Sequence, residues 1–118
     1  MAGKSIPQVL EEIAMLLEIK GENPFKTRAY YNAAKALSGI EDLEEMIRER
    51  RLKEIRGIGD AIAAKIEEYV NTGAVAYYED LKKEVPPSLL ELLQVPNLGP
   101  KKIKVLYGTV MKTEDEKQ

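Results

Sequence analysis

Apolar residues recur at helical spacing along most of the chain, and no segment shows the sustained alternation of apolar and polar residues typical of a strand. Ser5 and Gln8 fit a capping box and Pro7 fits a first helical turn, so we expect a helix over about residues 6–19. The apolar positions of this helix are Ile6, Val9, Leu10, Ile13, Leu16 and Leu17.

The same spacing, together with residues that start and stop helices, predicts the elements that follow. Asn23 and Pro24 begin a helix over about residues 24–37, and Ser38 and Gly39 end it. Helices are also predicted over about residues 42–50 and 60–71, in AVAYYEDLKKEV and in SLLELLQV. Gly73 suits a left-handed C-cap. In the second helix Phe25, Ala29, Ala33, Ala34 and Leu37 are available to pack, and Lys26, Arg28 and Asn32 are more exposed. We therefore expect an all-α protein.

The chain contains an internal repeat of two units. Sliding the sequence by 40 residues aligns IRGIGDAIAAKI with VPNLGPKKIKVL, so that Ile55 matches Val95, Ile58 matches Leu98 and Gly59 matches Gly99. Each unit has the spacing of a helix-hairpin-helix, in which the glycines turn the chain with positive φ and the apolar residue between them enters the core. Free N–H groups at the start of the following helix would then suit a phosphate oxygen.

A single Gly-x-Gly is equally well explained as a tight connection between two packed helices. The second copy, which has Asn97 in place of the first glycine and continues as PKKIK, favours phosphate binding. Because phosphates carry no sequence information, such binding should have no sequence preference. A Rossmann or Walker site is excluded because no predicted strand precedes the glycines.

Composition removes several classes of function. The 118 residues contain no cysteine and no histidine, which excludes disulfides, hydrolase triads and zinc fingers. No stretch approaches the length of a membrane span, and the first residues lack the order of a signal peptide, so we expect a monomeric, cytoplasmic protein with no membrane partner. The formal net charge is −2, but basic residues gather in KGENPFKTRAYYNAAK and in NLGPKKIKVLYGTVMK.

Three segments together carry a resemblance to a known family. NPFKTRAYYNAAKAL, LKEIRGIGDAIAAKIEEYVNTG and VPNLGPKKIKVLY resemble the amino-terminal region of family X DNA polymerases, the DNA polymerase beta-like group, and look most like its bacterial and archaeal members. The resemblance implies a helical bundle like the amino-terminal domain of DNA polymerase beta, with a four-helix lyase-type domain over residues 1–74. A second, fingers-like hairpin unit would cover residues 75–112, and a solvated tail residues 113–118.

The resemblance also implies a partner and a set of contacts. The partner would be gapped, nicked or 5′-phosphorylated duplex DNA. Lys26 and Tyr30 fall where the family contacts the 5′ phosphate, and Phe25 falls where an aromatic residue stacks on a template base. The remaining expected DNA contacts are Gly57, Ile58, Gly59, Asn97, Gly99, Lys101, Lys102 and Lys104. No cofactor is required, although Na⁺ or K⁺ would bind the backbone carbonyls of Lys53, Ile55 and Ile58, and of Leu93, Val95 and Leu98.

Lys65 falls on the lysine that forms a Schiff base with an abasic sugar in members with deoxyribose-phosphate lyase activity. That chemistry requires an unprotonated amine. Ala61, Tyr77 and Tyr31 stand where lyase-active eukaryotic members have basic residues, so we expect Lys65 to stay protonated, and Asp60 to cap its helix and repel phosphate. The 118 residues contain no Asp-x-Asp motif to hold catalytic metal ions, so we do not expect polymerase activity from them. Three functions therefore remain open: gap-directed DNA binding, an abasic-site lyase using Lys65, and a protein-interaction module.

Overall fold

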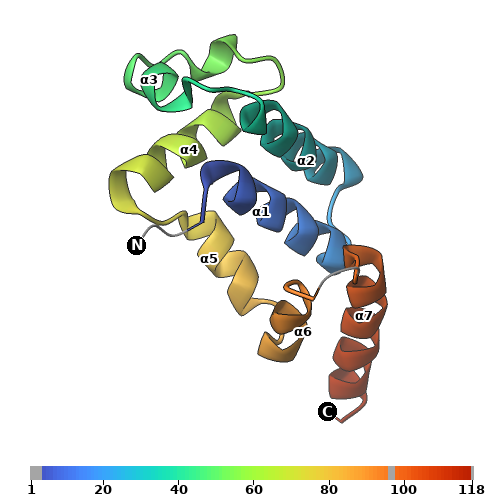
Figure 1. The fold of residues 1–118 in the computed structure, drawn as a ribbon. Helices are drawn as coiled ribbons and strands as arrows, with labels where there is room; N and C mark the ends of the chain where they lie inside the picture. The colour runs from blue at the N-terminus through green and yellow to red at the C-terminus, as the bar shows by residue number, and fades with distance from the viewer. Residues whose placement is uncertain (1–3, 96–97, 118) are drawn as a thin grey trace.

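The computed structural model describes residues 4–95 and 98–117, with side chains described as far as residue 109. Within these ranges it contains helices and no strand, which confirms the predicted all-α fold (Figure 1). The helices are α1 (Ile6–Lys20), α2 (Pro24–Ser38), α3 (Leu43–Arg48), the short 3-10 helix η1 (Leu52–Glu54), α4 (Asp60–Thr72), α5 (Ala76–Lys83), α6 (Pro87–Leu92) and α7 (Pro100–Lys117). The range predicted as a tail is thus helical as far as Lys117.

The helix starts follow the predicted capping signals. The Ser5 side chain accepts the N–H of Gln8 at 3.3 Å, and the Gln8 side chain accepts the N–H of Ser5 at 2.8 Å, which completes the capping box of α1. The Asn23 side chain accepts the N–H of Phe25 at 2.8 Å at the start of α2. These bonds satisfy N–H groups that have no partner inside the helix, so local sequence is sufficient to fix where both helices begin.

Two helix ends show how far local signals reach. Gly73 ends α4 with φ +81°, in the predicted left-handed conformation. The helix predicted over residues 42–50 is shorter than expected, because α3 ends at Arg48 and Arg50 adopts φ +57°. The N–H of Arg51 then reaches back to the Met46 carbonyl at 2.8 Å, which closes the helix without a glycine.

Helix α1 lies at the centre of the molecule and packs against α2, α5 and α7 (Figure 1). A helix covered from three sides buries more than one narrow stripe of side chains. Its buried set therefore includes Ala14 and Ile19 in addition to the predicted Val9, Leu10, Ile13, Leu16 and Leu17.

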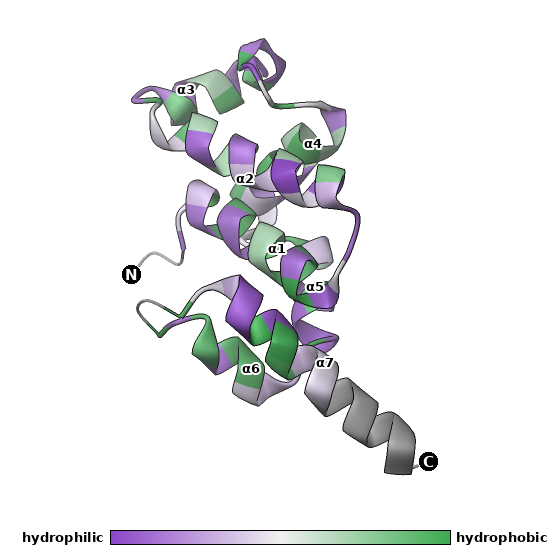
Figure 2. Ribbon diagram, turned by 90° about the vertical axis from the view of Figure 1, so that its right-hand side faces the viewer, coloured by the Kyte–Doolittle hydropathy of each residue, from purple (hydrophilic) through white to green (hydrophobic). Residues whose placement is uncertain are grey.

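One continuous core runs through both halves of the chain. Its buried residues from the second half include Val75, Tyr78, Leu81, Val85, Leu89 and Ile103. The molecule is elongated, with extents of 52 × 30 × 27 Å. Figure 2 shows α3 and the start of α4 at one end of the long axis and α6 and α7 at the other. The first hairpin therefore lies at one end, whereas the second lies beside the carboxyl end of α1, where Lys104 approaches Gly21. The division at residue 74 stays a prediction.

Candidate nucleic-acid interface

The first hairpin, residues 54–59, turns the chain from η1 into α4. The N–H of Ile58 donates to the carbonyl of Ile55 at 3.1 Å, and the Ile58 side chain is buried, as predicted. Gly57 has φ +97°. We expected positive φ at both glycines, but Gly59 is extended with φ −93° and is the N-cap of α4, where its carbonyl accepts the N–H of Ala63 at 2.9 Å. A single left-handed glycine is therefore enough to make this turn.

The second hairpin repeats this hydrogen bonding. The N–H of Leu98 donates to the Val95 carbonyl at 3.3 Å, and the N–H of Ile103 donates to the Gly99 carbonyl at 3.4 Å. These bonds join the residues equivalent to those of the first hairpin, which confirms the repeat predicted from the sequence. Asn97, an expected DNA contact, lies outside the described residues.

The two hairpins differ in how deeply they enter the core. Ile55 is 9% exposed, whereas its counterpart Val95 is 44% exposed. Likewise Ile66 in α4 is buried and its counterpart Leu106 in α7 is exposed. The first hairpin is thus embedded in the bundle, and the second stands at its edge.

The two hairpins also offer a phosphate different donors. No side chain caps α4, so the N–H groups of its exposed first turn are available. In α7, Pro100 has no N–H and the N–H of Lys102 is bonded to the Gly99 carbonyl at 3.2 Å. The side chains of Lys101, Lys102 and Lys104 are exposed there instead. The first hairpin is therefore suited to bind phosphate through the backbone, and the second through ammonium groups.

Asp60 does not cap α4, contrary to expectation. Its carboxylate lies 2.7 Å from the Nζ of Lys53, so the pair joins η1 to the first residue of α4. Hydrogen bonding to this ammonium group and its charge lower the pKa of the Asp60 carboxyl. The repulsion that Asp60 would exert on a phosphate is accordingly offset by a neighbouring positive charge.

The predicted cation sites involve backbone carbonyls that are partly used. The carbonyl of Ile55 in the first hairpin and that of Val95 in the second each accept one hydrogen bond already. A carbonyl oxygen has two lone pairs, so each keeps one for a cation. No group of three or more acidic, cysteine or histidine side chains that could hold a metal ion occurs among the described residues. A monovalent cation at the carbonyls of Lys53, Ile55, Ile58, Leu93, Val95 and Leu98 stays a prediction.

Four side chains from three helices meet and form what we call the Tyr77 cluster: Lys26 and Tyr30 from α2, Lys65 from α4 and Tyr77 from α5. The rings of Tyr30 and Tyr77 stack with centroids 6.1 Å apart. The Nζ of Lys26 lies 4.8 Å from the Tyr77 centroid, and the Nζ of Lys65 lies 4.9 Å from it. Two predicted phosphate contacts, Lys26 and Tyr30, and the candidate Schiff-base lysine therefore all contact the Tyr77 ring. From the sequence, Tyr77 was expected only to stand where relatives have a basic residue.

Burial and two neighbouring charges act on the pKa of Lys65. Burial lowers the pKa of Lys65, the charge of Lys26 lowers it further, and the Glu68 carboxylate opposes these effects. Our expectation that this amine stays protonated remains a prediction. The charge of Lys26 disfavours protonation of this amine, whereas the face of the Tyr77 ring attracts an ammonium group.

Tyr30 is more deeply buried than a phosphate contact usually is, with 3% of its surface exposed. Burial and the neighbouring Tyr77 raise the pKa of its hydroxyl to about 12, so it remains a neutral donor. In the part of the chain that the structure describes, the Tyr30 hydroxyl makes no hydrogen bond. Every fully buried side-chain oxygen there has a hydrogen-bond partner, so the Tyr30 oxygen is not fully buried. Its oxygen therefore keeps contact with solvent and could reach a ligand.

Phe25 does not pack into the bundle, although the helical pattern made it available to do so. It is 77% exposed at the first turn of α2, next to Lys26. An exposed aromatic ring beside a lysine suits stacking on an unpaired base, which is the role that the family resemblance implies.

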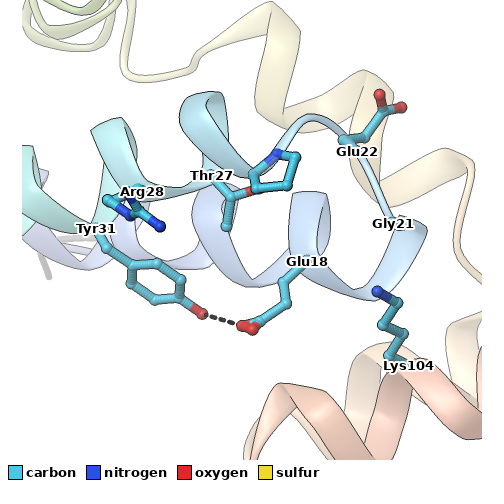
Figure 3. A pocket seen from close by; sticks show the side chains of 8 residues that line it. Glu18, Gly21, Glu22, Thr27, Arg28, Tyr31 and Lys104 are labelled. Carbon is cyan, nitrogen blue, oxygen red and sulfur yellow. Dashed lines mark hydrogen bonds between the residues drawn. The ribbon is translucent and has the colours of Figure 1, made fainter.

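A groove of about 300 Å³ joins the amino-terminal half to the second hairpin unit. Figure 3 shows Arg28 of α2 at one end of this groove and Lys104 of α7 at the other, with Tyr31 and Glu18 between them. The Tyr31 hydroxyl donates to Glu18 at 3.2 Å. The sequence placed Arg28 in one basic segment and Lys104 in the other, but gave no signal that the two segments share a groove.

A tandem helix-hairpin-helix bundle with lysines at both hairpins defines the class of this protein. Comparison with known proteins agrees: residues 1–75 match the model of the helix-hairpin-helix domain family, and the chain belongs to that family. The chain is also 41% identical over 111 residues to the DNA polymerase/3′-5′ exonuclease PolX of Bacillus subtilis (strain 168), a match that covers 91% of this chain and 18% of that protein. This similarity confirms the resemblance to family X polymerases. The chain spans less than a fifth of the length of this relative.

Among the described residues, no helix is both long and apolar enough to span a membrane.

Proposed function

We propose that this chain binds the backbone of gapped or nicked DNA, including a 5′ phosphate, without sequence preference. One observation carries the proposal: the same hairpin hydrogen bonds occur twice, each time directly before a helix whose start faces solvent. The relative named above is a DNA polymerase, which supports DNA as the ligand. In this proposal the chain is the amino-terminal part of a family X repair polymerase and does not polymerise DNA by itself.

The separation of the two hairpins supports a discontinuous duplex as the target. A DNA ligand bound at both hairpins must extend from the start of α4 to the start of α7. A gap lets the two flanking duplexes bend relative to each other, so each hairpin can bind its own flank. The Tyr77 cluster would then hold the 5′ phosphate.

The direct experiment is a titration followed by fluorescence anisotropy. Three labelled duplexes are compared at low and moderate salt: an intact one, one with a single-nucleotide gap and a 5′ phosphate, and the same gap with a 5′ hydroxyl. We expect the tightest binding to the phosphorylated gap. If about three phosphates are contacted, the plot of log K against log salt should have a slope of about −2.7. Equal, negligible binding to all three duplexes would reject the proposal.

A second candidate is an abasic-site lyase, which the lowered pKa of Lys65 favours. The unprotonated Nζ would attack the C1′ aldehyde of the opened sugar to form a C–N bond, and after a proton is taken up from solvent, water would leave to give an iminium. Loss of the C2′ proton to solvent would then expel the 3′ phosphate by β-elimination. Borohydride trapping on an incised abasic duplex tests this chemistry. A covalent adduct that is lost in Lys65→Ala and retained in Lys35→Ala, a control at an exposed lysine outside the expected DNA contacts, is expected. No adduct with the unchanged protein would exclude the lyase.

A further inference from the structure

The Tyr77 ring is the shared contact of two positive charges. Lys26 and Lys65 come from helices far apart in the sequence, and both ammonium groups lie within 5 Å of the centroid of this one ring. Two neighbouring cations repel each other, and the charge of Lys26 is accordingly one cause of the lowered pKa of Lys65. The negative face of an aromatic ring attracts both ammonium groups, so the ring offsets part of the repulsion.

The position of Tyr77 is itself fixed by a bond between α4 and α5. The Glu68 carboxylate accepts the N–H of Ala76, the first residue of α5, at 2.8 Å, and Val75 just before it is buried. Tyr30 packs against the Tyr77 ring from α2. The backbone next to Tyr77 and its ring therefore each have a contact within the protein before any ligand binds.

The cluster is also short of negative charge. In the described part of the chain, neither Lys26 nor Lys65 forms an ion pair. Glu68, the one carboxylate whose charge acts on Lys65, is bonded to the start of α5. Two ammonium groups without a carboxylate partner suit an anion that carries two charges. A phosphate monoester carries between one and two negative charges near neutral pH, whereas an internal phosphodiester carries one.

We propose that Tyr77 is a positioning residue whose ring holds the ammonium groups of Lys26 and Lys65 together so that both contact one terminal phosphate group. The identity of the ligand, a 5′-terminal phosphate of DNA, rests on the function proposed above. The pairing of the two lysines by the ring does not depend on that function. Residue 77 thus contributes to the phosphate site as a tyrosine, although lyase-active relatives have a basic residue at this position.

The positioning is tested without DNA, through the electrostatic coupling of the two lysines. Lysines are dimethylated with ¹³C-formaldehyde, and the titration of Lys65 is followed by NMR, with the resonance assigned from a Lys65→Arg variant. Lys26→Ala should raise the midpoint of this titration by about 0.5 in pH, because a neighbouring positive charge is removed. The same change should have no effect when the ring is absent, in Tyr77→Leu or Tyr77→Met, and should keep its effect in Tyr77→Phe.

Lys35→Ala, a change at an exposed lysine of α2, is the matched control and should leave the Lys65 midpoint unchanged. Circular dichroism establishes that each variant is folded, and two ring-free variants are used so that the failure of one leaves the other. An effect of Lys26→Ala that is as large in the ring-free variants as in the unchanged protein overturns the positioning role.

The ligand is tested with gapped duplexes carrying a 5′ phosphate or a 5′ hydroxyl. The preference for phosphate should fall at least fivefold in Tyr77→Leu and remain in Tyr77→Phe, while affinity for the 5′-hydroxyl duplex changes less than twofold. A preference retained in Tyr77→Leu overturns the assignment of the terminal phosphate to this ring. Failure of the unchanged protein to bind any duplex rejects the proposed function instead, and the NMR result still decides the positioning.

Discussion

The carboxylate of Asp60 lies 2.7 Å from the ammonium group of Lys53, and the pair spans the first hairpin. Lys53 precedes the turn and Asp60 is the first residue of the helix that follows it. The pair therefore places one charge of each sign beside the N–H groups that are proposed to bind phosphate. Both side chains are largely exposed, so the pair contributes little to stability and acts mainly on the local field.

Replacing Asp60 by asparagine should strengthen DNA binding. The change removes the negative charge at the start of α4 and frees the Lys53 ammonium group to contact phosphate. We expect an affinity for the gapped duplex about threefold higher at low salt, with the gain disappearing as salt is raised, measured by anisotropy. Asp42→Asn, at the residue just before α3 whose side chain makes no capping bond, is the control and should have a smaller effect. Weaker binding by Asp60→Asn would contradict a phosphate site at this hairpin.

The two glycines of the first hairpin should respond differently to alanine. Gly57 has φ +97°, where an added Cβ is strained even though no atom stands in its way, so Gly57→Ala should lower the free energy of unfolding by about 1–2 kcal/mol. Gly59 has φ −93° and open space around its Cβ position, so Gly59→Ala should cost less. Urea denaturation measures both values. Equal losses for the two variants would show that the turn tolerates a residue other than glycine at Gly57.

The helices could be predicted because their limits depend on neighbouring residues. Ser5 with Gln8, Asn23 and Gly73 each act within one turn of chain, and each was found where the sequence placed it. The end of α3 was missed because Arg50 adopts a left-handed conformation that residues other than glycine rarely take. The hairpins could be predicted because the motif occurs twice in the sequence.

The side-chain partners within the site could not be predicted in the same way. The pairing of Asp60 with Lys53 and the contact of Tyr77 with Lys65 depend on how separate helices pack, which no local pattern encodes. The family resemblance therefore placed Tyr77 near Lys65, but it gave no sign that Lys26 contacts the same ring. It treated Tyr77 as the loss of a cation, whereas in the structure two ammonium groups lie within 5 Å of the centroid of its ring.

The attachment of α7 to the bundle should depend mainly on Ile103. This side chain is fully buried in the core, and α7 packs against α1 and α6. Ile103→Ala should lower the free energy of unfolding by about 2–5 kcal/mol, because it removes buried methyl groups and leaves a cavity. Leu106→Ala, on the same helix but 42% exposed, is the matched control and should cost much less. Chemical denaturation followed by circular dichroism gives both values, and similar losses would contradict the docking of α7 through Ile103.

Alkaline pH should destabilise the protein partly through Tyr30. Burial raises the pKa of this hydroxyl to about 12 from the 10.0 of an exposed tyrosine. Between these two values the unfolded chain loses the phenolic proton and the folded chain keeps it, so fewer protons are bound in the unfolded state and stability falls as pH rises. Tyr30→Phe cannot ionise and should escape this part of the fall.

The measurement is the free energy of unfolding of the unchanged protein and of Tyr30→Phe at pH 8, 10 and 12. At pH 8 the hydroxyl is neutral in both folded and unfolded chains, so the difference between the two proteins there reports only the lost hydroxyl. From pH 10 to 12 Tyr30→Phe should gain stability relative to the unchanged protein, because only the unchanged protein favours an ionised unfolded state. A difference that stays constant over this range would show that the Tyr30 hydroxyl titrates normally, and that the Tyr30 and Tyr77 rings leave it open to water.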